Sequence, residues 1–568
     1  MRTRIFINFA VCLFLIGLFL RLYRLGEVPT GLYWDETAIL VDVRSVVESW
    51  HDMHGNFFLQ AIYPSYGDYK APGLPIIASL VAFGFGVSSW SLRLVLVLAW
   101  ILSTIAGLGC LWLVLQNTHR RNRQMVSLAF LAITSVAPWS FFFSRVAFES
   151  FLSQAWMLVS VFFLLASFHS TNKKSHGVLL LAFSVLFGAA AGYTYFAARY
   201  IWSGLLGLLV CFQFLTIKKK TPVLLIKLGG KFVLLLLAYY ILLLPLTRSP
   251  LYQNSQAYRL STKSLVSEEA QLSQVLASNY YKDLAGNSFL SKLVFHRKVF
   301  FLKEFARNVA DHLAPNYLFA VGDSNLRHGT GRQGLLLLTF VPLVIFGAYT
   351  LWRKRPSLLL LFCGWYLVAI VPASFAEETP HAMRSLVGLF PLLAVVSFGL
   401  VACINYWQKS QAKWSKMLLF GWLLLLCFDV FSYFYYYFGA YRQASARAWQ
   451  TGYNEIVTLV ENNREADEKV LLSFPDGRLY LWFLASGTYS AQELQSLPYE
   501  AYQVTSFDKL DFRDVVGATK QELEQYAILF LSQSQAEQVS AAVNLNIIDS
   551  LQMQDVTYVL ARSDWSQR

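Results

Sequence analysis

The chain has 568 residues, of which 56% are hydrophobic and only 14% are charged. Soluble domains carry about a quarter charged residues, so this composition excludes a purely soluble protein and predicts a polytopic membrane protein. The net charge of +13 would suit a nucleic-acid-binding protein, but the basic residues gather in short loops between apolar segments. The six cysteines lie in or beside apolar runs without CxxC spacing, which indicates neither a disulfide framework nor a zinc site.

Apolar runs of about 20 residues, the length that spans a membrane, recur along the first 437 residues. The first run is followed by Arg21 and Arg24 instead of a small-residue cleavage site, so we expect an uncleaved first span and no signal peptide. We expect eleven spans, at 5–22, 91–115, 125–143, 150–168, 178–197, 200–217, 231–247, 334–352, 357–374, 385–406 and 417–437.

The run 73–87 is shorter, is interrupted by Gly84 and Gly86, and follows Pro72. We expect it to form a helix that lies in the plane of the membrane surface. With this run left out of the span count, the basic loops fall on one side together with the N-terminus. By the positive-inside rule that side is the cytoplasm. These loops are 119–123, 173–174, 218–220, 353–355 and 409–416.

The residues after 437 differ in composition from the rest of the chain. Helix-like stretches alternate there with the short apolar runs 469–474, 479–485, 527–532 and 557–561, a pattern typical of a small α/β domain. We therefore expect a transmembrane domain over 1–437, with outer loops at 23–90 and 248–333, and an extracytoplasmic α/β domain over 438–568.

The first outer loop contains the acidic pair Asp35 and Glu36, directly after Trp34. One interpretation is structural, since acidic residues stabilise the positive end of a helix that begins here. The other is catalytic, with a rigidly held carboxylate at the membrane surface and Trp34 as one wall of a sugar site. The two interpretations are compatible.

The same loop holds Asp68, Tyr69 and Lys70 just before Pro72. Lys70 could be a lysine that snorkels at the lipid boundary, or a point charge that pairs with a phosphate.

Further polar side chains lie at the outer ends of later spans. Arg145 and Glu149 are spaced for a helix-surface salt bridge or for a functional pair at the membrane edge. His328 and Arg332, in the loop 321–334, and His381 and Arg384, in the turn 377–384, could bind a phosphate group or anchor the chain at the surface. The histidines lack the spacing of metal ligands, so we assign no metal site, although a divalent metal would be compatible with these residues.

The order of these features resembles the GT-C superfamily of glycosyltransferases that use polyprenyl-phosphate sugars. Its members include protein O-mannosyltransferases and the aminoarabinose transferases of lipid A. The resemblance covers roughly residues 1–437 and consists of the early Asp-Glu pair, a Lys-x-Pro before an apolar segment, an Arg-plus-acid turn and a late Pro-His-x-x-Arg turn.

The resemblance implies an integral membrane glycosyltransferase that moves a sugar to an acceptor hydroxyl on the outer face of the membrane. Asp35 would be the catalytic base with Glu36 beside it. Lys70 and Tyr69, with Arg145, Arg332 and Arg384, would bind the lipid phosphate. Asp68, Glu149, His328, His381 and Trp34 are further candidates for the site. The partners implied are a polyprenyl-phosphate-linked sugar, membrane lipids and a protein, polymer or glycolipid acceptor.

Three other classes of protein remain open at this stage. A lipid-linked saccharide flippase or transporter would require charged residues within spans or broken, repeated helices. An O-antigen ligase or polymerase also uses cations on the outer face, but the early acidic pair is not its signature. A structural scaffold would leave the ordered first loop unexplained.

Overall fold

The computed structural model describes residues 3–65, 68–169, 174–217, 221–262, 264–474, 478–496, 504–541 and 543–563. The chain folds into two compact units. The helical unit comprises Met1–Leu25 and Arg93–Ala440, and the mixed unit comprises Gly26–Leu92 and Tyr441–Arg568. The predicted basic loop 218–220 and residue 173 lie outside the described residues.

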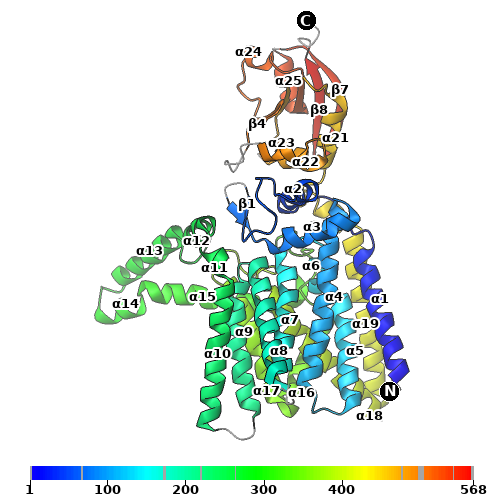
Figure 1. Ribbon diagram of the computed structural model, residues 1–568, viewed down its shortest axis with the longest axis vertical. Helices are drawn as coiled ribbons and strands as arrows, with labels where there is room; N and C mark the ends of the chain where they lie inside the picture. The colour runs from blue at the N-terminus through cyan, green and yellow to red at the C-terminus, as the bar shows by residue number, and fades with distance from the viewer. Residues whose placement is uncertain are drawn as a thin grey trace. The chain divides into compact units, whose positions relative to one another are not determined.

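The helical unit is a bundle of long helices with one helical excursion between α11 and α16 (Figure 1). Its helices are α1 (Thr3–Leu22), α4 (Ser89–Val114, which starts at the end of the mixed unit's first segment), α5 (Arg120–Val136), α6 (Pro138–Phe143), α7 (Glu149–His169), α8 (Lys174–Thr194), α9 (Ala198–Thr216), α10 (Pro222–Leu242), α11 (Leu244–Thr247), α12 (Pro250–Thr262), α13 (Glu268–Leu284), α14 (Phe289–Val294), α15 (Arg297–Leu313), η1 (Asn316–Ala320), η2 (Leu338–Phe340), α16 (Val341–Lys354), α17 (Pro356–Ala373), η3 (Leu386–Gly388), α18 (Leu389–Lys409) and α19 (Lys413–Phe438).

Helices occur at all eleven predicted spans, and among the described residues eight of them are long and apolar enough to cross a membrane. These eight are α1, α4, α7, α8, α9, α17, η3 with α18, and α19. The chain is therefore a multi-pass helical membrane protein, as the composition predicts.

At the other three predicted spans the helices have different bounds from those predicted, and a proline lies near each changed end. The helix α5 ends at Val136 because Ala137, which precedes Pro138, adopts an extended conformation. The helix α10 ends at Leu242, just before the short α11 with Pro245 in its first turn. The helix α16 begins at Val341, with Pro342 in its first turn, so the predicted start at 334 is too early.

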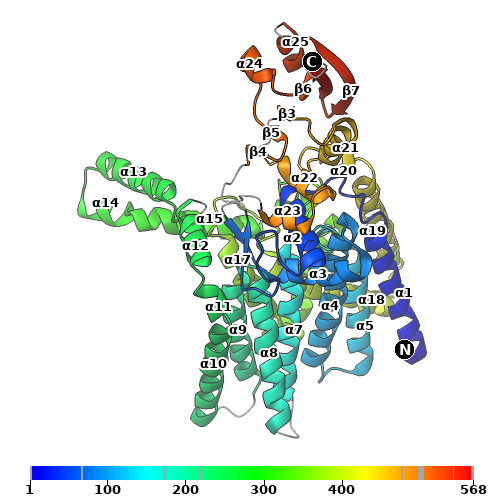
Figure 2. The same ribbon diagram turned by 45° about the horizontal axis from the view of Figure 1, so that its top comes forward.

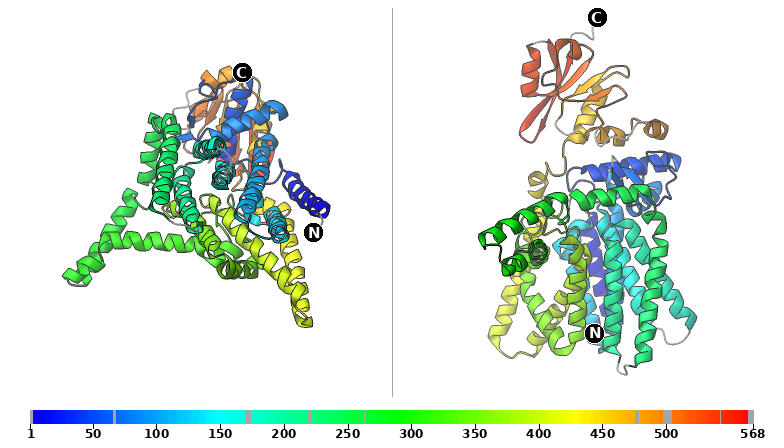
Figure 3. Two further views of the ribbon diagram at one scale, coloured as in Figure 1. Left: turned by 60° about the horizontal axis from the view of Figure 1, so that its bottom comes forward. Right: turned by 90° about the vertical axis from the view of Figure 1, so that its left-hand side faces the viewer.

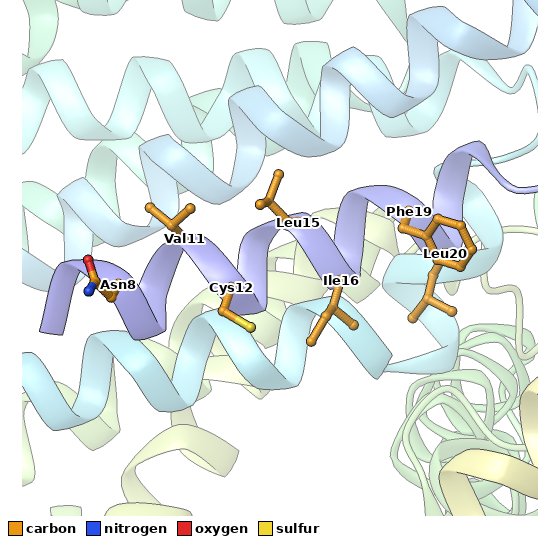
Figure 4. Close-up of a pocket in the computed structure, with 7 residues that line it drawn as sticks. All are labelled: Asn8, Val11, Cys12, Leu15, Ile16, Phe19 and Leu20. Atoms are coloured by element: carbon orange, nitrogen blue, oxygen red, sulfur yellow. The ribbon is translucent and has the colours of Figure 1, made fainter. Parts of the chain in front are cut away.

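The helices α1 and α19 lie at the edge of the helical unit. Only 11% of the apolar window of α1 and 6% of that of α19 is buried. Along α1 an open groove is lined mainly by aliphatic and aromatic side chains, among them Val11, Leu15, Ile16 and Phe19 (Figure 4). Exposure of such an apolar face to water is unfavourable, so the face fits contact with lipid.

The predicted second outer loop, 248–333, is largely helical. Its helices α13, α14 and α15 form an arm that extends sideways from the other helices of this unit (Figures 1 and 3). After the arm, η1 leads into the segment 321–337, which holds Asp323 and His328 and precedes α16. The turn that holds His381 and Arg384 precedes α18.

The mixed unit contains a six-stranded sheet in the order β4-β5-β3-β6-β8-β7. Strands β5, β3 and β6 run parallel, while β4, β8 and β7 join antiparallel. Its elements are α2 (Trp34–Ser49), β1 (Tyr63–Ser65), β2 (Asp68–Lys70), α3 (Gly73–Phe85), α20 (Tyr441–Ala444), α21 (Tyr453–Asn463), β3 (Val470–Leu472), α22 (Tyr480–Ser486), α23 (Ala491–Ser496), β4 (Ser506–Phe507), β5 (Leu510–Phe512), α24 (Lys520–Leu523), β6 (Ile528–Ser532), α25 (Gln533–Ser540), β7 (Leu545–Met553) and β8 (Val556–Ser563).

Side chains alternate between the two faces of the sheet, as the strand period of two requires. Val470 and Leu472 of β3 belong to the core cluster that also contains α21, α22 and part of α2. Leu471 faces the other cluster, which contains α25. The predicted α/β domain is thus present, with β4, β5 and β7 added to the strands that the sequence indicates.

One apolar run of the tail forms a different structure from its neighbours. Residues 479–485 lie in α22, whereas the runs at 469–474, 527–532 and 557–561 contain the strands β3, β6 and β8. The side chains from Tyr480 to Leu484 are all buried. A helix buried on every side has no polar face, so its sequence cannot be told from that of a buried strand by periodicity.

The first outer loop packs within the mixed unit, beside the C-terminal elements. Figures 1 and 2 show α2 next to α22 and α23, and Ala38 and Val41 of α2 are part of the same core cluster as β3. The helix α3 has 13 residues, which agrees with a segment too short to span a membrane. Its orientation to the membrane plane stays a prediction.

Candidate functional site

Asp35 and Glu36 lie in the first turn of α2, as the sequence predicts. The Asp35 side chain is exposed, whereas Glu36 is fully buried. The N-cap residue is Tyr33, which makes no capping side-chain bond. The backbone N–H of Trp34 donates instead to Oε1 of Gln450 at 2.9 Å, so a side chain more than 400 residues away satisfies one of the free amides at the start of this helix.

The rest of α2 is bound to the C-terminal elements by polar contacts. Arg44 donates to the carbonyl oxygens of Ala485 and Gly487 at 3.4 and 3.0 Å. The carboxylate of Glu48 accepts a hydrogen bond from the backbone N–H of Ala491 at 2.9 Å. These contacts at the C-terminal end of α2 fix the helix against the C-terminal elements, so Asp35 is carried by a rigid helix.

Lys70 ends β2 and is paired with a carboxylate that the sequence analysis missed. Its Nζ lies 3.8 Å from Oδ2 of Asp42, and the two side chains are 9% and 1% exposed. Asp42 follows Asp35 by seven residues, which is almost two turns of a helix, or about 10 Å along its axis. Asp35 and the Lys70–Asp42 pair therefore lie along one face of α2.

Asp42 is poised to change its charge near neutral pH. Burial raises the pKa of Asp42 to about 7, against the opposing charge of Lys70 and with a further rise from Asp52. Asp52 is itself fully buried, and one of its carboxylate oxygens accepts hydrogen bonds from the backbone N–H groups of His54 and Asn56 at 2.9 and 2.8 Å. Asp42 follows Asp35 at the spacing that puts two residues on the same face of a helix, and this spacing is the signal that could have revealed it.

The remaining candidates of the first loop are placed as follows. The guanidinium carbon of Arg478, from the C-terminal segment, lies 3.8 Å from the ring centre of Trp34, a cation–π contact that covers one face of this aromatic residue. Tyr69 is buried in β2. Asp68 begins β2, but its side chain lies outside the described residues.

Arg145, in the helical unit, holds the C-terminal end of α1. Its Nη1 donates to the carbonyl oxygens of Leu20, Arg21 and Tyr23 at 3.0, 2.7 and 2.8 Å. Its Nη2 donates to the carbonyl of Arg24 at 3.0 Å, and its Nε donates to the hydroxyl of Tyr437 at 3.3 Å. The buried guanidinium thus satisfies carbonyl groups that have no partner within the helix, and a phosphate would have to share these donors.

The other polar candidates of the helical unit occupy more accessible positions. Glu149 is the first residue of α7 and is half-buried. Arg332 is exposed and lies over the ring of Tyr436, 5.4 Å from its centre. Arg384 is half-buried and contributes to the electrostatic environment of His381.

The fold brings His328 and His381 together at Asp323, although they are 53 residues apart in the chain. The Nδ1 atoms of His328 and His381 lie 3.3 and 3.9 Å from the same oxygen, Oδ2 of Asp323. All three side chains are buried, and the two imidazole rings stack with their centres 4.5 Å apart. Burial, together with the charges of Arg384 and His328, lowers the pKa of His381 to about 2.

His312 is a further residue of this region that the sequence analysis missed. It is fully buried. Its Nδ1 donates to the carbonyl of Asn308 at 2.8 Å, so its Nε2 accepts the hydrogen bond from the backbone N–H of His381 at 3.1 Å. Its spacing of four residues from Asn308 on α15 gives no hint of the turn that it positions.

No protein-family model matches the chain, and no curated protein matches it by sequence. The search of solved structures finds ArnT from Cupriavidus metallidurans in the apo state, at 12% identity and a TM-score of 0.49, covering 98% of this chain and 97% of that one. The same protein bound to undecaprenyl phosphate matches at 13% identity and a TM-score of 0.49, with the same coverage.

A second solved protein is the oligosaccharyltransferase AglB from Archaeoglobus fulgidus, in complex with an inhibitory peptide and a dolichol-phosphate. It matches at 12% identity and a TM-score of 0.46, covering 92% of this chain and 69% of that one. Both proteins are members of the GT-C superfamily, which is the superfamily that the sequence pattern resembles. At these identities and scores we transfer no residue role from them.

Proposed function

We propose that the chain is an integral membrane glycosyltransferase that moves a sugar from a polyprenyl-phosphate donor to an acceptor hydroxyl. The observation that carries this proposal is the face of α2 on which an exposed carboxylate, Asp35, lies about two helical turns from the buried Lys70–Asp42 pair. A direct sugar transfer from a lipid phosphate requires a base, here on α2, and a phosphate-binding cation, here in β2 beside the same helix.

The proposed reaction is a single displacement. The acceptor oxygen forms a bond to the anomeric carbon while the bond from that carbon to the phosphate oxygen breaks, through a transition state with oxocarbenium character. Asp35 takes the proton of the acceptor hydroxyl, and the polyprenyl phosphate leaves with the bonding electron pair. Attack opposite to the leaving group predicts inversion at the anomeric carbon.

Lys70 would stabilise the charge that accumulates on the leaving phosphate. Asp42 opposes this role, because it already neutralises the lysine at 3.8 Å. The raised pKa of Asp42, about 7, offers a solution, since the approach of a phosphate anion would favour uptake of a proton by Asp42. The carboxyl group of Asp42 would then no longer neutralise the ammonium of Lys70, which would pair with the phosphate of the donor.

Glu36, which is fully buried, would support the position of the base without touching the substrate. Trp34, stacked under Arg478, would form part of the acceptor side of the site. Tyr69, which precedes Lys70 in β2, would support the phosphate contact of Lys70 within the mixed unit. Arg145, Arg332 and Arg384 of the helical unit stay candidates for phosphate binding that the resemblance implies.

We place the mixed unit on the extracytoplasmic side, with the N-terminus in the cytoplasm. The support is the charge of the short loops on the opposite side, which carry basic residues and no acidic ones. The donor would then be bound from the outer leaflet, with a protein, polymer or glycolipid as acceptor.

The test is transfer by the purified full-length protein from radiolabelled undecaprenyl-phosphate sugars, measured as release of undecaprenyl phosphate. The variant Asp35→Asn should lower turnover by about a hundredfold or more at unchanged thermal stability. The matched control is Glu455→Gln, a change of the same kind at an exposed position in the first turn of α21 in the same unit, which should keep its turnover. Equal rates for the Asp35→Asn variant and the unmodified protein would refute the assignment of the base.

Lys70 is tested by the dependence of the rate on donor concentration. The variant Lys70→Ala should mainly raise the donor concentration needed for half-maximal rate, because the lost contact is with the donor phosphate. An unchanged donor dependence would remove Lys70 from the phosphate site. Movement of intact labelled donor across a vesicle membrane, without release of undecaprenyl phosphate, would favour a flippase over a transferase.

A further inference from the structure

We propose that Asp323, His328 and His381 bind a divalent transition-metal ion, with zinc as the best match. The three side chains come from two separate loops of the helical unit, and each offers one ligand atom, all within 4.8 Å of one another. Two imidazole nitrogens and one carboxylate oxygen are a common ligand set for zinc.

The distances between the ligand atoms fit such an ion. Bonds of about 2.0–2.1 Å in a tetrahedral zinc site place neighbouring ligand atoms about 3.4 Å apart. The distances from Oδ2 of Asp323 to Nδ1 of His328 and of His381, 3.3 and 3.9 Å, lie on either side of this value. Small rotations of the imidazole rings would bring all three atoms into coordination.

The hydrogen bonds of the cluster leave a place for a cation. The Nδ1 atoms of His328 and His381 are buried, and neither makes a hydrogen bond among the described residues. Two buried imidazole nitrogens aimed at one carboxylate oxygen, both without good hydrogen-bond geometry, are costly unless something else satisfies them.

The surroundings supply the outer shell of a metal site. The backbone N–H of Ala382 donates to Oδ2 of Asp323 at 2.8 Å, which orients the carboxylate in the way that second-shell contacts orient metal ligands. Beside Asp323 and His328 lies a cavity of about 10 Å³, which is also lined by Thr330. It has room for about one water molecule, the usual fourth ligand where a protein supplies three.

The ion would join the segment before α16 to the turn before α18. It would act as a structural link between two loops that also carry Arg332 and Arg384, and the link does not depend on the reaction proposed for Asp35. Without a metal, the same geometry would be a contact of both imidazole rings with the carboxylate of Asp323.

The test is the metal content of the full-length protein, purified without a polyhistidine tag. The protein is stripped with a chelator, incubated with Zn²⁺, freed of loosely bound metal and analysed by mass spectrometry of the elements. We expect about one zinc per chain, and a rise in the thermal midpoint when Zn²⁺ is added back. The double variant His328→Gln/His381→Gln should lose both, whereas His169→Gln, elsewhere in the helical unit, should keep both.

Two further measurements keep the test decisive if the double variant fails to fold. Asp323→Asn keeps an oxygen for the Ala382 N–H but removes the charged ligand, and it should bind zinc at least tenfold more weakly. Cobalt added to the stripped unmodified protein should give the visible absorption of a low-symmetry site and be displaced by zinc. Unmodified protein that holds less than about a tenth of an equivalent after reconstitution would overturn the proposal.

Discussion

The substitution Gly399→Ala tests the close crossing of α16 and α18. A Cβ atom added at Gly399 would lie 1.8 Å from the backbone oxygen of Leu343, and one added at Gly347 would lie 2.0 Å from the backbone oxygen of Val395. Each helix thus presents a glycine to the backbone of the other, as in membrane helices that pack through small residues.

The magnitude follows from the distance that has to be gained. A carbon and an oxygen that are not bonded need about 3.4 Å, so the two helices would have to separate by roughly 1.5 Å, and a gap of even 0.5–1 Å forfeits a quarter to a half of each dispersion contact. Overpacking costs about 1–3 kcal/mol when side chains can adjust. Because backbone atoms cannot rotate away, we expect about 3 kcal/mol or more.

The assay is the thermal midpoint of unfolding in detergent, followed by size-exclusion chromatography after heating. The matched control is Gly421→Ala on α19, where an added Cβ meets nothing within 4 Å. It should leave the midpoint unchanged or raise it, since alanine favours the helix. Identical midpoints for the Gly399→Ala and Gly421→Ala variants would refute the close crossing. A loss of zinc in the Gly399→Ala variant would connect the crossing to the metal site, because α16 and α18 follow the two loops that carry it.

Two further predictions concern buried charges. The folded protein holds a proton on Asp42 up to about pH 7, whereas the unfolded chain releases it near pH 4. The free energy of unfolding should therefore fall by about 4 kcal/mol as the pH rises through this window. Asp42→Asn should flatten this part of the curve of unfolding free energy against pH, and an unchanged curve would contradict the burial of an ionisable group there. Arg145→Lys should lower the free energy of unfolding by about 3 kcal/mol or more, because one ammonium cannot replace the hydrogen bonds to four carbonyl groups. Unchanged stability together with a higher donor concentration for half-maximal rate would show instead that Arg145 serves mainly to bind the phosphate.

Much of the helical unit could be predicted from the sequence, because a membrane span is a local property. About 20 apolar residues in a row must form a helix to satisfy their backbone groups in lipid, and all eleven predicted spans contain helices. The ends of α5 and α16 were wrong by several residues where proline interrupts the apolar run. The first-turn position of Asp35 and Glu36 is equally local, since acidic residues favour the start of a helix.

The sequence by itself thus determined a helical membrane protein, an acidic helix start in its first loop and a small α/β domain at its end. Only the tertiary structure decided that Lys70 faces Asp42 instead of standing alone, that α2 shares a core with the C-terminal strands, and that His328 and His381 meet at Asp323. The physical reason is that these contacts join segments tens to hundreds of residues apart. Periodicity and spacing report only on neighbours along the chain, whereas burial and pairing depend on which surfaces the folded chain brings together.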